Sequence, residues 1–113
     1  MSTNQGPHAD SQQVFFIDKI LVPAAAKQEF TERMNLNRAF IKQLAGFVKD
    51  EVYERRDEQG NFIYITVATW ENEEALKKAK DAVQAEYKRE GFNPAAFFER
   101  LKIVMDRGIY TKP

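Results

Sequence analysis

The chain contains no cysteine and only one histidine, and these two shortages exclude several kinds of site. Without cysteine it can form neither a disulfide bond nor a thiolate metal centre. A zinc or iron centre built on imidazoles needs several histidines close together, whereas the single histidine, His8, stands in a polar stretch near the start of the chain. We therefore expect no protein-bound metal.

An excess of one charge and a long apolar run are also missing. Lys and Arg number 17, and so do Asp and Glu, whereas nucleic-acid-binding proteins need concentrated positive charge to displace counterions from phosphate. No segment is long enough to cross a bilayer, and the polar first residues lack the apolar stretch of a signal peptide. We expect a cytoplasmic protein without nucleic-acid or membrane partners, with a disordered tail over residues 1–12 and one folded domain over residues 13–113.

What the chain does contain is an alternation of strand and helix patterns. Runs rich in β-branched and aromatic residues predict strands, and 3.6-residue periodicity between capping residues predicts helices. The predicted strands cover residues 14–22, 47–57, 62–70 and 101–110, and the predicted helices cover 23–44, 72–91 and 93–101. A turn signal, EQGN, joins the two central strands as a hairpin. This β-α-β-β-α-β order predicts an α+β fold of the ferredoxin-like type with an antiparallel sheet.

The central strand FIYITVATW, residues 62–70, predicts self-association. Successive side chains of a strand point to opposite faces, and here both faces are apolar. One face would carry Phe62, Tyr64, Ala68 and Trp70, and the other Ile63, Ile65 and Val67. A single helix layer buries only one face, and soluble monomers seldom expose a large apolar patch. We therefore predict a homodimer.

The first predicted helix carries two polar residues where apolar ones are expected. Asn37 falls in the middle of its apolar stripe and Arg33 on the edge. Asn37 either bonds a backbone group or a buried water, or it lines a cavity together with Arg33. Trp70 likewise either fills the core or forms a cavity wall. Tyr64 could present its hydroxyl to a ligand or lie across a subunit contact.

The element order together with TVATWENEEALKKA resembles the antibiotic biosynthesis monooxygenase family over about residues 14–111, with FIDKILV and LAGFVKDEVYE in further support. The resemblance implies that two subunits pack their sheets face to face into a dimeric α+β barrel, with a pocket in each between sheet and helices. It also implies, for members that act as monooxygenases, oxidation of phenolic or quinol-like substrates by O2 without flavin, haem or metal. Trp70 matches the strand-end tryptophan of the family, whereas Asn37 and Arg33 match no motif residue.

The chain also departs from the family. Many members carry histidines on the second helix, where this chain has Lys77, Lys78 and Lys80. The haem-degrading branch uses an asparagine on the first strand and a tryptophan and a histidine on the second helix, all of which are missing here, so haem degradation by that mechanism is not expected.

Two functional hypotheses follow. The first is a cofactor-independent monooxygenase acting on a small aromatic molecule, and the alternative is a non-catalytic dimeric module that binds a hydrophobic small molecule. The predicted substrate-binding residues are Trp70, Asn37, Arg33 and Tyr64. No residue is assigned as the catalytic base.

Overall fold

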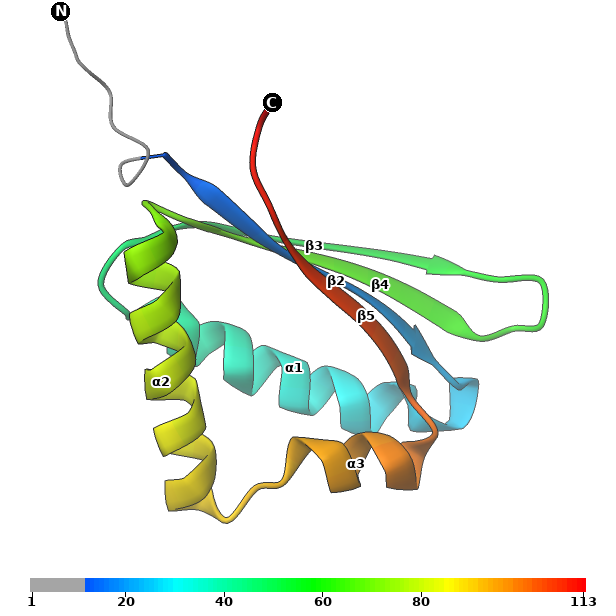
Figure 1. The fold of residues 1–113 in the computed structure, drawn as a ribbon. Helices are drawn as coiled ribbons and strands as arrows, with labels where there is room; N and C mark the ends of the chain where they lie inside the picture. The colour runs from blue at the N-terminus through cyan, green and yellow to red at the C-terminus, as the bar shows by residue number, and fades with distance from the viewer. Residues whose placement is uncertain (1–11) are drawn as a thin grey trace, which may run out of the picture.

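The computed structural model describes residues 12–113 as a four-stranded antiparallel sheet with helices on one side (Figure 1). Strand β2 pairs with β4 on one side and β5 on the other, which gives the order β3-β4-β2-β5. The strands are β2 (Val14–Val22), β3 (Phe47–Arg56), β4 (Phe62–Trp70) and β5 (Val104–Tyr110). The helices are η2 (Ala24–Ala26), α1 (Lys27–Ile41), α2 (Glu73–Glu90) and α3 (Pro94–Leu101). The predicted ferredoxin-like α+β fold is confirmed, whereas the predicted tail lies outside the described residues except for Gln12.

The predicted boundaries of α2 and α3 hold where a capping residue marks them. Asn72 begins α2 by accepting a hydrogen bond from the backbone N–H of Ala75 at 2.8 Å, and Asn93 caps α3 in the same way. Gly91 ends α2 with a φ of 71°, in the left-handed region that favours glycine. Local sequence signals therefore place α2 and α3 correctly.

Three predicted boundaries are wrong. The first helix was expected over residues 23–44, but Ala24–Ala26 form the 3-10 helix η2 and α1 begins only at Lys27. It ends at Ile41, after which the chain continues in turns with i→i+3 hydrogen bonds. Leu44 still packs against the Trp70 side of the core, which explains why the apolar periodicity continues past the helix end. The last strand begins at Val104 rather than at residue 101, because α3 keeps its last turn through Leu101 and Lys102.

The outer face of the sheet carries no helix (Figure 1). On this face Ile65 and Val67 of β4 are half-buried, while Tyr53, Val104 and Tyr110 expose half of their surface or more. Dimerisation through this face remains a prediction. None of the helices within residues 12–113 combines the length and apolar character that a membrane span requires.

Candidate functional site

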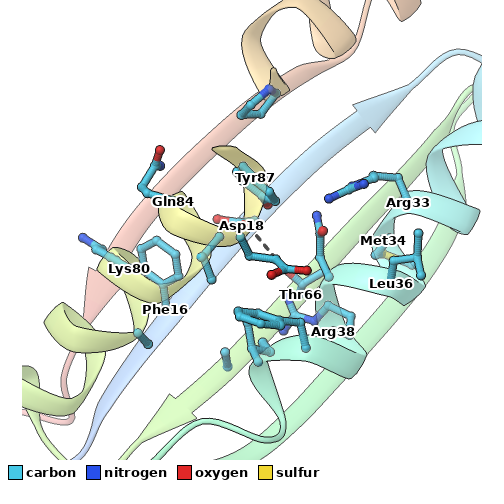
Figure 2. A pocket seen from close by; sticks show the side chains of 18 of the residues that line it. Phe16, Asp18, Arg33, Met34, Leu36, Arg38, Thr66, Lys80, Gln84 and Tyr87 are labelled. Carbon is cyan, nitrogen blue, oxygen red and sulfur yellow. Dashed lines mark hydrogen bonds between the residues drawn. The ribbon is translucent and has the colours of Figure 1, made fainter. Parts of the chain in front are cut away.

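A cavity of about 600 Å³ lies between the helix-facing side of the sheet and the helices. Its floor comes from β2, β4 and β5, and α1 and α2 form two facing walls (Figure 2). Aromatic side chains from the α2–α3 turn and α3 line one end. The principal lining residues are Phe16, Asp18, Phe30, Arg33, Met34, Asn37, Arg38, Thr66, Ala68, Trp70, Leu76, Lys80, Gln84, Tyr87, Phe92, Phe97, Phe98 and Arg107.

The floor contains one buried charged group, the carboxylate of Asp18. Strand register places Asp18 directly between Thr66 of β4 and Arg107 of β5. The guanidinium of Arg107 donates from Nε to Oδ1 at 2.7 Å and from Nη2 to Oδ2 at 2.9 Å, and the Thr66 hydroxyl donates to Oδ2 at 3.5 Å. The hydrogen bond with Asp18 raises the pKa of Arg107 above its usual value. Asp18 therefore holds an ion pair at the cavity floor.

Trp70 closes the floor at the end of β4 and is 2% exposed. Its ring packs edge-on against Phe47 at 5.5 Å between centroids and contacts the core cluster that includes Leu76 and Ala79. The indole Nε1–H is buried and has no hydrogen-bond partner within residues 12–113. Indole nitrogen is a donor only, and buried donors ordinarily find an acceptor. Trp70 thus belongs to the core and also lines the cavity.

Arg33 and Asn37 lie one turn apart on α1, and both line the cavity. Arg33 bonds Glu90 of α2 at 2.6 Å, and its guanidinium carbon lies 3.7 Å from the centre of the Phe92 ring. This arrangement connects α1 to the end of α2 across one side of the cavity. Asn37 is half-buried on the same wall. The structure therefore brings three of the four predicted binding residues to one cavity, and binding of a ligand by them remains a prediction.

Comparisons with protein-family models and with curated protein sequences give no match. Among solved structures, SnoaB, a cofactor-independent oxygenase from Streptomyces nogalater, is 25% identical, with 90% of this chain and 94% of that chain covered and a TM-score of 0.63. A candidate antibiotic biosynthesis monooxygenase from Caulobacter crescentus is 16% identical, with 93% of each chain covered and a TM-score of 0.68. The chain has the fold of the antibiotic biosynthesis monooxygenases. A candidate monooxygenase from Shewanella loihica is 21% identical over 91% of this chain and 96% of that chain, with a TM-score of 0.67.

Within this antibiotic biosynthesis monooxygenase fold, Tyr64 does not line the cavity. It is 1% exposed and packs with Phe30, at 5.2 Å between ring centroids, in the core cluster around Ile20 and Val22. Burial raises the pKa of its phenol above the usual range. The structure places Tyr64 in the core, so contact with a ligand would require a rearrangement.

Several residues that line the cavity were not predicted from the sequence. Asp18 is the only acidic residue of β2, and its partner is Arg107 of β5 rather than a residue next to it in the sequence. Arg107 and Thr66 gave no sequence signal, because their positions at the site depend on strand register, whereas Tyr87 lies on the apolar stripe of the second predicted helix. Burial raises the pKa of the Tyr87 phenol. In the described part of the chain, no group of three or more His, Cys, Asp or Glu residues is arranged to hold a metal ion.

Proposed function

We propose that this protein is a cofactor-independent monooxygenase that oxidises a small phenolic or quinol-like aromatic molecule with O2. The observation that carries the proposal is the cavity lined by Trp70, whose buried Nε1–H has no acceptor within the described residues. The indole nitrogen is fully buried, so a ligand oxygen would supply that acceptor only after a small movement of the neighbouring side chains. The fold shared with SnoaB, a cofactor-independent oxygenase, supports the same reaction class.

The size and lining of the cavity fit an aromatic ligand. About 600 Å³ lies within the roughly 300–1,000 Å³ range of small-molecule sites, which combine mostly apolar walls with a few polar groups. Phenylalanine rings line the floor, the α1 wall and one end, and the polar groups lie on the floor, on α1 and the turn after it, and on α2. Planar aromatic rings can pack on such walls while a hydroxyl or carbonyl oxygen meets Trp70 or Asn37.

The proposed reaction needs no external reductant. When an anthrone is oxidised to an anthraquinone, one CH2 group becomes C=O, one oxygen atom enters the product and the other leaves as water. The substrate supplies all four electrons, after loss of a proton has made it an electron-rich anion. The protein would hold that anion through the Trp70 Nε1–H and the Asn37 amide and would keep bulk water from the rings.

One observation favours the alternative of a non-catalytic module that binds a hydrophobic small molecule. Asp18 is the only carboxylate on the cavity floor within residues 12–113, and both of its oxygens accept bonds from Arg107. Both oxygens of this carboxylate are therefore already engaged by a cation of the protein. Under the alternative, ligands would bind beside Trp70 and leave unchanged.

Oxygen consumption separates the two functions. We expect the protein to accelerate O2 uptake with at least one member of a panel of hydroquinones and anthrones, above the autoxidation rate in buffer. Trp70→Phe keeps a ring but removes the donor, and it should lower kcat/KM by about tenfold, the effect of losing one hydrogen bond to a charged oxygen. Binding of panel members without any acceleration of O2 uptake would contradict the monooxygenase and support the binding module.

A further inference from the structure

The charges around the cavity are paired with one exception. Arg33 is paired with Glu90, Arg38 with Asp50, Arg107 with Asp18, and Glu86 with Arg89. Lys80 of α2 is the one charged lining residue without an ion-pair partner among residues 12–113. The charge that remains uncompensated at the cavity is therefore positive.

Lys80 and a second cation, Arg107, both contact the ring of Phe16. The Nζ of Lys80 is 5.0 Å from the centre of the Phe16 ring, and the guanidinium carbon of Arg107 is 4.7 Å from that centre. Figure 2 shows Lys80, Phe16 and Gln84 together on the α2 side of the cavity. The two bonds to Asp18 use Nε and Nη2 of Arg107, which leaves its Nη1 group for another acceptor.

We propose that Lys80 and Arg107 form a subsite for a carboxylate group carried by the aromatic ligand. A carboxylate that reaches both would pair the free ammonium and accept a bond from Nη1. The inference rests on the proposed function only in taking this cavity as the place where an aromatic ligand binds.

The spacing of polar groups along the floor agrees with such a ligand. Phe16, which contacts both cations, pairs with Ala68 of β4, and Trp70 stands two residues beyond Ala68. Two residues of a strand span about 7 Å. An aromatic ligand whose carboxylate and oxygen are that far apart is of suitable length to reach both the cations and Trp70.

The test compares two probes that differ in charge, anthraquinone-2-carboxylate and the neutral 2-(hydroxymethyl)anthraquinone. The chain has a single tryptophan, so quenching of its fluorescence reports binding beside Trp70. We expect wild-type protein to bind the carboxylate about fivefold more tightly than the alcohol, the strength of one partly exposed ion pair. Lys80→Gln should bring the ratio of the two Kd values close to one, and Lys80→Arg should restore it.

Lys78→Gln is the matched control, because it removes the same charge from an exposed position on α2 that does not line the cavity. Its Kd ratio should equal that of wild type. A wild-type ratio near one, an unchanged ratio in Lys80→Gln, or no binding of the carboxylate would overturn the proposed subsite. A clear preference for the carboxylate without O2 uptake on the corresponding anthrone would support the subsite and contradict the oxygenase function, so the two failures are distinguishable.

Discussion

Replacing Asn37 by leucine separates a structural role of this residue from a ligand-binding role. Asn37 is half-buried on the cavity wall of α1. Leucine favours a helix over asparagine by about 0.4 kcal/mol, and the cavity leaves room for its side chain. If the amide serves a ligand, the free energy of unfolding should stay the same or rise by about 0.5 kcal/mol, which corresponds to about 2–4 °C in Tm. Thermal unfolding followed by circular dichroism measures this change.

Ligand binding, in contrast to stability, should become weaker in Asn37→Leu. Leucine cannot donate to or accept from a polar group of the ligand, and a polar group left unpaired in the cavity costs about 1–3 kcal/mol, so the Kd of a planar aromatic should rise roughly 5- to 150-fold. Titration of Trp70 fluorescence reports the Kd. Asn35→Leu is the matched control, since Asn35 lies on an exposed part of α1 outside the cavity and should show the same small stabilisation with an unchanged Kd. A fall in Tm of several degrees for Asn37→Leu, with binding retained, would show that the amide is structural and refute the reasoning.

Three further predictions concern the assembly and stability of the chain. Because the outer sheet face exposes Tyr53, Val104 and Tyr110, light scattering at micromolar concentration should give twice the 13.1 kDa of one chain, and a monodisperse 13.1 kDa species would exclude the homodimer. Lys102 has a φ of 60°, so Lys102→Gly should stabilise the protein by about 0.5–1 kcal/mol, and a lower Tm would contradict this. Asp18→Asn deprives Arg107 of its anion and should cost about 1–2 kcal/mol in urea unfolding, less than for a fully buried pair because Arg107 is 49% exposed; an unchanged midpoint would argue against a stabilising pair.

Local signals in the sequence were sufficient for the fold. Asn72, Gly91 and Asn93 act within one helical turn, so their effects follow from residue type and spacing alone. The alternation in β4 likewise gave the correct face for each side chain, with Tyr64 and Trp70 both toward the helices. The end of α1 was predicted too late because an apolar stripe reports packing, and packing continues through the turn that follows the helix.

The site was only partly predictable, because its floor depends on contacts between residues far apart in the sequence. Asp18 meets Arg107 through the pairing of β2 with β5, which no local pattern specifies. Alternation also fails to say how far along a sheet a cavity extends. Trp70 lies at the end of β4 that borders the cavity, whereas Tyr64, on the same face, lies six residues away beneath Phe30 in the closed core.

The hydrogen-bond donors that line the cavity affect whether an oxygenase of this kind needs a catalytic base. A hydrogen bond donated to an ionised oxygen lowers its pKa, and Trp70 Nε1 can only donate. The one carboxylate on the floor, Asp18, is occupied by Arg107 and therefore offers little to a neutral hydroxyl. Under the proposed function, a phenolic or enolic ligand would meet donors at its reactive oxygen and lose its proton to water. A cavity that stabilises the anion itself does not require a dedicated base. The lack of an assigned catalytic base is therefore weaker support for the non-catalytic alternative than the residue pattern alone suggested.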